Sequence, residues 1–189
     1  MQRRLAALSL ALLIGLVLVR AVLLKRRTGA RVIHFGEIDK KDFLIPPFAL
    51  FYIYTVFAGA FDLPLVSVWE FFHSEAVAWF GVVLCLAGLI LLSLSLLSFG
   101  KSFRIGIDAK NPDALVTTGV FAHTRNPIFV AFILVLLGQF LVFPNWILLA
   151  YLAAGIWLIH RQILREEAFL HERYGREYAE YRKRVRRYL

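Results

Sequence analysis

The 189 residues of the chain are enough for one compact domain, and their composition is that of a membrane protein. Hydrophobic residues make up 60% of the chain and charged residues 19%, against about a quarter charged in a soluble domain. A soluble fold of this size has too little interior for so much apolar side chain, so a water-soluble protein is excluded. The net charge of +9 is spread over short segments between apolar runs. That distribution favours contact with anionic membrane lipids and gives no reason to expect a nucleic-acid partner.

The first apolar run covers residues 5–24, close to the roughly 20 residues that a spanning helix needs. It ends in the basic triplet Lys25-Arg26-Arg27 and contains no small-residue cleavage site. These features are typical of a retained membrane helix rather than of a cleaved signal peptide.

Four further apolar runs follow the first. They cover residues 43–61, 76–98, 127–143 and 146–164. Pro144 and Asn145 leave almost no loop between the last two runs, so these two helices must form a tight antiparallel hairpin. The sequence therefore predicts five transmembrane helices followed by a polar tail.

Basic residues alternate along the connections between these runs. Six lie between the first and second runs, none in residues 62–75, four in residues 99–126, none in the hairpin turn, and nine beyond His160. By the positive-inside rule the N-terminus is outside and the C-terminus is cytoplasmic. Termini on opposite sides require an odd number of spans, which agrees with five.

The tail repeats aromatic residues at helical spacing. Tyr174, Tyr178, Tyr181, Val185 and Tyr188 fall every three or four residues and form one stripe on a helix, with basic residues on the other faces. Such a helix lies at the membrane surface, or packs over the cytoplasmic mouth of the bundle, or does both. The predicted fold is all-α: an integral membrane bundle of five transmembrane helices with a cytoplasmic C-terminal amphipathic helix.

The long cytoplasmic connection ends in a segment suited to binding an anion. Arg125 and Asn126 precede Pro127, which is preorganised for the first position of the fourth helix. The free N–H groups at a helix start bind anionic or carbonyl groups. The alternative for Arg125 is an anchor at the membrane interface.

The end of the fifth helix carries a second group of charged residues. Arg161, Arg165, Glu166 and Glu167 lie next to the hydrocarbon layer, where charges are costly, so they are functional candidates. The alternative is that they pair with one another on a solvated helix end. The only cysteine, Cys85, lies inside an apolar run, so no thiolate metal site is expected.

Three motifs in order resemble the isoprenylcysteine carboxyl methyltransferase family, which is related to the membrane phospholipid methyltransferases. They are Leu115-Val-Thr-Thr-Gly-Val-Phe121 with Arg125-Asn126-Pro127-Ile-Phe129, the turn Pro144-Asn145-Trp146, and Glu166-Glu167 followed by Tyr174-Gly175, Glu177-Tyr178 and Tyr181. The match covers about half the chain. It divides the chain into an N-terminal three-helix membrane region, residues 1–98, and a methyltransferase-like region, residues 99–189, with the hairpin at residues 127–164.

The resemblance implies a membrane-embedded methyltransferase that uses S-adenosylmethionine and acts on a lipophilic or lipid-modified acceptor. In that family the methyl donor lies in a cytoplasmic pocket formed by the loop before the hairpin, the mouth of the hairpin and the C-terminal segment. The donor-binding residues that it implies are Asp113, Ala114, Leu115, Val116, Phe121, Arg125, Asn126, Pro127, Ile128 and Glu166.

The catalytic candidates are Arg125, Glu167 and Arg161. The family's common Arg-His-Pro is Arg-Asn-Pro here, which excludes any role that needs a histidine proton. The family's tyrosine two residues beyond is Phe129 in this chain. Its substrate-side arginine falls nearest Gln162, with Arg161 and Arg165 as candidates by a small shift.

The resemblance favours carboxyl O-methylation of an isoprenylcysteine-like substrate, and two alternatives stay open. A carboxylate acceptor is already ionised and needs no base. The amine of a phospholipid would have to lose a proton, and Glu167 is the candidate base. Glu166 is expected at the donor's ammonium or ribose, because a carboxylate beside the sulfonium stabilises the ground state more than the transition state. The other alternative is a lipid-binding or scaffold protein without enzymatic activity.

Overall fold

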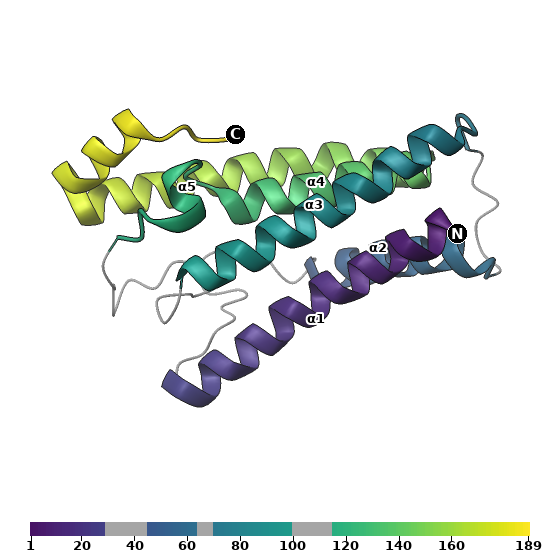
Figure 1. Cartoon of the computed structure of the whole chain (residues 1–189), viewed down its shortest axis with the longest axis horizontal. Helices are drawn as coiled ribbons and strands as arrows, with labels where there is room; N and C mark the ends of the chain where they lie inside the picture. Colours follow the sequence, from purple (N-terminus) through teal and green to yellow (C-terminus); the bar gives the residue numbers. More distant parts are fainter. Residues whose placement is uncertain (29–44, 64–69, 100–114) are drawn as a thin grey trace.

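Helices make up the regular structure of the computed structural model, which describes residues 1–28, 45–63, 70–99 and 115–189. They are α1 (Gln2–Thr28), α2 (Ile45–Phe61), α3 (Glu75–Phe99), the 3-10 turn η3 (Gly119–Ala122), α4 (Pro127–Val142) and α5 (Trp146–Arg184). In these residues the only β-type pairing is two isolated bridges. The long helices lie beside one another in an elongated bundle (Figure 1). The predicted all-α fold is confirmed.

The helix bounds agree with the predicted apolar runs except at α5. Residues 43–44, where the second run was predicted to begin, lie outside the described residues. The fifth apolar run ends at residue 164, and its helix was predicted to extend a little further, to Glu166 and Glu167; α5 continues beyond both, to Arg184. Residues 165–174 are mostly charged residues and good helix formers, so the helix persists after the apolar residues stop. An apolar run measures the length that suits lipid, not the length of the helix.

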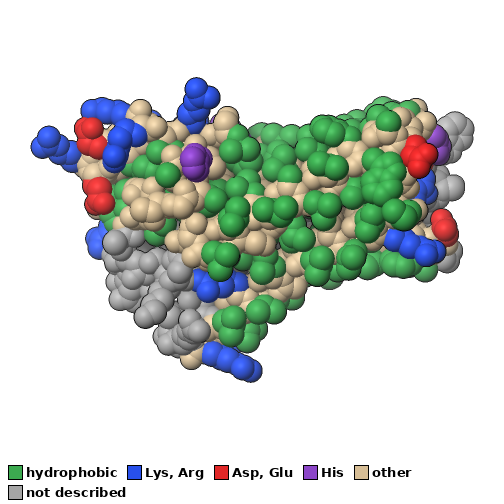
Figure 2. Space-filling model, in the orientation of Figure 1, with side chains coloured by type: hydrophobic (Ala, Val, Ile, Leu, Met, Phe, Trp, Pro, Cys, Tyr) green, Lys and Arg blue, Asp and Glu red, His purple; other side chains and the backbone are tan. Residues whose placement is uncertain are grey.

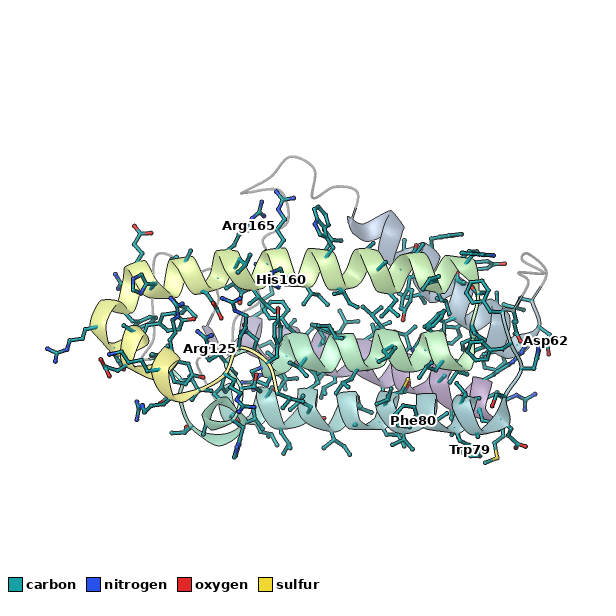
Figure 3. The ribbon with its side chains drawn as sticks, turned by 90° about the horizontal axis from the view of Figure 1, so that it is seen from above. Asp62, Trp79, Phe80, Arg125, His160 and Arg165 are labelled. Atoms are coloured by element: carbon teal, nitrogen blue, oxygen red, sulfur yellow. The ribbon has the colours of Figure 1, made fainter. Side chains whose placement is uncertain are left out.

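The bundle has two chemically different ends, shown in Figures 1 and 3. The turn end holds the N-terminus, Asp62 and the Pro144-Asn145 turn. The tail end holds η3, Arg125 and the last turns of α5. Where the connections are described, those predicted to be outside (residues 62–63, 70–74 and the hairpin turn) therefore lie at one end of the bundle, and residues 115–126, predicted to be cytoplasmic, lie at the other. Which end faces the cytoplasm stays a prediction.

The surface between the two ends is apolar. Figure 2 shows hydrophobic side chains over the middle of one face, with charged side chains gathered toward the ends. Among the described residues, three helices are long and apolar enough to cross a membrane: Gln2–Leu23, Glu75–Ser98 and Trp146–Arg184. The two shorter apolar helices have 17 and 16 residues. At 1.5 Å per residue they reach about 24–26 Å, against a hydrocarbon core of about 30 Å. The predicted count of five spans therefore stays a prediction.

Small residues bring α3 and α4 into backbone contact. A Cβ atom added at Gly138 would lie 2.5 Å from the carbonyl oxygen of Gly81 and 2.7 Å from Sγ of Cys85. A Cβ atom at Gly88 would lie 2.8 Å from the carbonyl oxygen of Ala131. Small residues at such spacing are the usual means of close helix packing in membranes, where van der Waals contact replaces the hydrophobic effect.

A buried polar side chain joins three helices near the turn end. Gln139 of α4 is fully buried. Its Oε1 accepts a hydrogen bond of 3.1 Å from the Tyr52 hydroxyl of α2, and its Nε2 donates one of 3.3 Å to the carbonyl of Ala6 in α1. One hydrophobic core cluster likewise contains residues from α1 to α5. The predicted division at residue 98 stays a prediction, and the core runs across it.

The predicted tight hairpin between the last two helices is confirmed. α4 ends at Val142 and α5 begins at Trp146. The side chain of Asn145 caps α5 by accepting a hydrogen bond of 2.9 Å from the backbone N–H of Leu148. The hairpin places the start of α4 beside the part of α5 that carries Glu167, which is where the candidate site forms.

Candidate active site

The loop that enters α4 passes close to the end of α3. Gly119 has a φ of +63°, and a Cβ atom there would collide with the side chain of Ser98, so this turn requires glycine. η3 follows directly, and Pro127 occupies the first turn of α4 as predicted. Asn126 is the N-cap residue, but its side chain makes no capping hydrogen bond. Its amide is directed instead toward α5 and the tail.

The tail turns back over the bundle at Gly175. This residue has φ 49° and ψ −115°, a conformation that residues with a Cβ atom rarely adopt. Beyond it, Tyr178 and Tyr181 are buried, and the Tyr181 hydroxyl donates a hydrogen bond of 2.6 Å to the carbonyl of Phe121. Of the arrangements that the sequence left open, packing over the mouth of the bundle is therefore observed. Contact of the tail with the membrane surface stays a prediction.

Residues 185–189, which we call the strap, run alongside the loop before α4. Thr124 and Arg186 form a parallel bridge, and the backbone N–H of Arg125 donates to the carbonyl of Arg186 over 2.9 Å. The carbonyl of Arg187 accepts from Nδ2 of Asn126 (3.1 Å) and from the Thr124 hydroxyl (3.2 Å). The strap thus fixes the backbone on which Arg125 is carried.

Glu167 of α5 is the centre of the site and is 6% exposed. Arg187 binds it in two-pronged fashion: Nε lies 3.1 and 3.2 Å from the two carboxylate oxygens, and Nη2 lies 2.8 Å from Oε2. On the other side, Nη1 of Arg125 lies 3.4 Å from Oε1 of Glu167. The bond to Glu167 raises the pKa of Arg187 above its ordinary value. Two arginines and one carboxylate leave this cluster with a net charge of +1.

The same cluster contains buried donors without an acceptor. The Arg125 side chain is 9% exposed, and its Nε and Nη1 make no hydrogen bond with any described residue. The hydroxyl of Tyr178 is buried beside the Arg125 guanidinium, with which it interacts. A buried polar group without a partner costs about 1–3 kcal/mol, and more if it is charged. The cluster therefore suits a bound anion, and a ligand carboxylate fits it.

Comparison with known proteins identifies the family. Residues 76–177 match the family model described as phospholipid methyltransferase. This chain belongs to that family. A protein-S-isoprenylcysteine O-methyltransferase of Schizosaccharomyces pombe is 35% identical over 105 residues, which are 54% of this chain and 44% of that protein. Protein-S-isoprenylcysteine O-methyltransferase B of Arabidopsis thaliana is 31% identical over 109 residues, 56% of this chain and 55% of that protein.

A solved structure shares the fold. The eukaryotic intramembrane Ras methyltransferase ICMT, an isoprenylcysteine carboxyl methyltransferase, superposes with a TM-score of 0.58 at 21% identity. The superposition covers 88% of this chain and 58% of that one. The chain thus spans about half the length of the relatives that it matches. The resemblance inferred from the three motifs is confirmed.

The family match covers α3, α4 and most of α5. It ends at residue 177, before Tyr178, Tyr181 and the strap. The carboxylate of Glu167 and the guanidinium of Arg125 lie inside the matched part, whereas Arg187 lies outside it. The bidentate partner of Glu167 is therefore supplied by a segment of this chain beyond the matched residues.

The other charged residues of α5, unlike Glu167, lie outside the cluster with Arg125 and Arg187. Glu166 accepts a hydrogen bond of 3.0 Å from Nε2 of Gln162, and it makes no ion pair among the described residues. Arg161 is exposed and stacks over the Trp157 ring, 5.6 Å from its centroid. Arg165 is exposed and extends from the side of α5 away from α4 (Figure 3). Neither Arg161 nor Arg165 joins the Glu167 cluster, so their roles toward a substrate stay predictions.

The remaining predicted donor-binding residues lie along the loop before α4. Asp113 and Ala114 fall outside the described residues. Leu115 and Val116 are half-buried in the segment that leads to Gly119. Phe121 and Pro127 are buried, and Ile128 packs against the core cluster of α1, α3 and α4. The contact of each with a donor stays a prediction.

Sequence reasoning did not single out two of the site's contacts. Arg187 was one of nine basic residues beyond His160, and nothing in its spacing distinguished it from its neighbours. The Tyr188 hydroxyl lies 2.6 Å from Nδ1 of His160, so the strap is also tied to the middle of α5. Tyr188 belonged to the aromatic stripe predicted for the tail, but its partner could not be inferred because that partner lies 28 residues away.

Proposed function

We propose that this chain is a membrane-embedded methyltransferase that uses S-adenosylmethionine and acts on a lipophilic or lipid-modified acceptor. The observation that carries the proposal is the buried cluster of net charge +1 in which Nε and Nη1 of Arg125 form no hydrogen bond with a described residue. It lies at the start of α4, where helix N–H groups also favour an anion. Several relatives of the chain bear the name of protein-S-isoprenylcysteine O-methyltransferase, which supports the same activity.

In this proposal Arg125 and Glu166 hold the two charges of the donor's amino-acid part. The donor supplies a methyl group on a sulfonium, already activated for displacement. Arg125 takes the carboxylate, since its Nε and Nη1 form no hydrogen bond with any described residue, Glu167 included. Glu166 takes the ammonium or a ribose hydroxyl, because it has no ion-pair partner among the described residues. Holding the donor and the acceptor aligned in a site that excludes water then provides most of the rate.

The geometry favours a carboxylate acceptor over an amine. An amine must lose a proton, and Glu167 was the candidate base. Both oxygens of Glu167 are engaged by Arg187, and one of them also faces Arg125 and Asn126 at 3.4 Å. To take a proton from an amine, Glu167 would have to give up hydrogen bonds that Arg187 donates to its oxygens. We therefore propose carboxyl O-methylation of an isoprenylcysteine-like acceptor, in which no base is required.

The proposed acceptor approaches from the lipid. About three turns before Glu167, α5 carries Ile156, Trp157 and Leu158, which are exposed and apolar. An isoprenyl chain could lie in the bilayer against this surface while its carboxylate reaches the polar tail end. In this arrangement the tail end faces the cytoplasm, as the basic connections predict.

Donor binding to the purified protein in detergent is the first test. We expect calorimetric titration to detect S-adenosylmethionine binding, which a lipid-binding or scaffold protein would lack. Transfer of a labelled methyl group is then measured with three acceptors: N-acetyl-S-farnesylcysteine, the same compound with its carboxyl amidated, and phosphatidylethanolamine. We expect labelling of the first compound only. Labelling of the phosphatidylethanolamine alone would replace the carboxyl proposal with the amine alternative.

A further inference from the structure

Two arginines share one carboxylate in the site, and they share it unequally. Arg187 makes three short contacts with Glu167, from 2.8 to 3.2 Å. Arg125 lies 3.4 Å from the same carboxylate without forming a hydrogen bond to it. An arginine and a carboxylate form their strongest pair in a bidentate geometry, and Arg187 occupies that geometry.

We propose that Arg187 is a positioning residue for donor recognition: by occupying Glu167 it keeps the N–H groups of Arg125 available for the carboxylate of the donor. This inference rests on the proposed function. Arg187 has no contact with the donor in this scheme, because its guanidinium is committed to Glu167. Its effect passes through the carboxylate to Arg125.

The net charge of the cluster decides how loss of Arg187 affects Arg125. With Arg125, Arg187 and Glu167 present, the net charge is +1, and one cation remains for an anionic ligand. Without Arg187 the net charge is zero, and among the described residues Arg125 is the only other cation that forms an ion pair with Glu167. Because Arg125 is already within 3.4 Å, a small movement would close a hydrogen-bonded pair. The donor carboxylate would then have to break that pair, which would leave the charge of Glu167 buried without a partner and so costs free energy.

The strap keeps most of its anchors when the Arg187 side chain is changed. Thr124, Arg125 and Asn126 bind the strap through the backbone carbonyls of Arg186 and Arg187. The Tyr188 hydroxyl binds His160. Substitution of the Arg187 side chain therefore tests the guanidinium rather than the presence of the strap.

The experiment is a calorimetric titration of S-adenosylmethionine and of its decarboxylated form, without acceptor, into four proteins: the unchanged chain, Arg187→Gln, Glu167→Gln with Arg187→Gln, and Arg186→Gln. Arg186 is the exposed neighbour on the strap, so Arg186→Gln is the matched control. Thermal unfolding of each protein is measured alongside.

We expect Arg187→Gln to weaken binding of S-adenosylmethionine by about ten- to a hundredfold, the effect of losing one charged hydrogen bond. Binding of the decarboxylated form should change less than threefold, because it has no carboxylate for Arg125. The double substitution again leaves Arg125 unopposed at a net charge of +1, so it should restore binding to within about threefold of the unchanged chain. Arg186→Gln should leave both ligands unaffected.

Three results would overturn the inference. Equal weakening of both ligands by Arg187→Gln would show that Arg187 only holds the strap in place. Weak binding of S-adenosylmethionine that persists in the double variant would also show that Arg187 only holds the strap in place. Unchanged binding in Arg187→Gln, with normal binding by the unchanged chain, would show that Arg187 has no part in recognition. If the unchanged chain binds no S-adenosylmethionine, the proposed function itself is wrong. If Arg187→Gln does not fold, Arg187→Lys replaces it, since lysine keeps the charge but cannot bind Glu167 bidentately.

Discussion

Arg125 is the residue whose surroundings say most about the site. It was predicted as a donor-binding residue, with an interface anchor as the alternative, and its side chain is 9% exposed. Its backbone is held by the strap, and its guanidinium faces Glu167 at 3.4 Å. An interface anchor would extend its charge toward headgroups, whereas this side chain is enclosed. The buried position therefore favours ligand recognition.

Arg125→Ala should weaken S-adenosylmethionine binding by about ten- to a hundredfold, since a charged hydrogen bond contributes roughly 1.5–3 kcal/mol. Calorimetric titration measures the change. Arg165→Ala is the matched control, because Arg165 is an exposed arginine at the same end of the bundle and outside the cluster. Full-strength binding by Arg125→Ala would remove Arg125 from the donor site.

Glu166→Gln should also weaken donor binding by about tenfold while leaving the fold intact, because the amide cannot neutralise the donor's ammonium. Arg125 pairs with Glu167, not with Glu166. The free energies of unfolding lost in Arg125→Ala and Glu166→Gln should therefore add in the double variant to within about 0.5 kcal/mol. A double variant clearly milder than the sum would reveal a direct pair between these two residues.

At the scale of the elements, the closest contact is that between α3 and α4. A Cβ atom at Gly138 would meet the backbone of Gly81, which cannot move without separating the helices. Close packing of this kind holds the hairpin to the rest of the bundle and so sets the position of the loop before α4. The contact between α3 and α4 therefore helps to position the site, although it lies outside it.

Gly138→Ala should destabilise the protein by about 1–3 kcal/mol, the usual cost of overpacking. Thermal unfolding in detergent measures this loss. Gly15→Ala serves as the control, because a Cβ atom at Gly15 meets nothing within 4 Å and alanine is the better helix former. A stability of Gly138→Ala equal to that of Gly15→Ala would mean that α3 and α4 do not touch in this register.

The reversal at Gly175 is the second decisive feature at this scale. Gly175→Ala places a Cβ atom at φ 49° and ψ −115°, which costs about 1–3 kcal/mol. Because a Cβ atom meets no neighbour there, the cost is conformational rather than steric against another segment. We expect the tail to detach more often, and trypsin to cleave it several-fold faster at its exposed basic residues. Glu172→Ala, an exposed helical position on the same helix, should leave cleavage unchanged.

At the scale of the whole molecule, the two ends of the bundle predict opposite sides of the membrane. The single native cysteine, Cys85, is buried, so maleimide labelling reports on the introduced cysteines alone. In intact cells a membrane-impermeant maleimide should label Ser74→Cys at the turn end and should not label Lys183→Cys at the tail end until the cells are broken. Both positions are exposed. Labelling of both in intact cells would refute the predicted orientation and the cytoplasmic site with it.

The sequence by itself determined the helices and the family. Apolar runs, the Pro144-Asn145 turn and the alternation of basic connections predicted helix positions because these depend on local composition and on the thickness of lipid. Two segments of the site, residues 125–127 and residues 166–167, could also be identified from the sequence, because charged residues beside hydrocarbon are rare.

Only the tertiary structure decided which of these charges meet. Arg125 pairs with Glu167 rather than Glu166 because Glu167 shares the buried face of α5 with Ile163, while Glu166 lies about 100° further round the helix. The return of the tail depends on one backbone conformation at Gly175, which sequence spacing does not reveal. That return brings Arg187 across 20 positions of chain to Glu167. Contacts made by a chain that folds back on itself depend on the path of the backbone between them, and residue type alone does not contain that path.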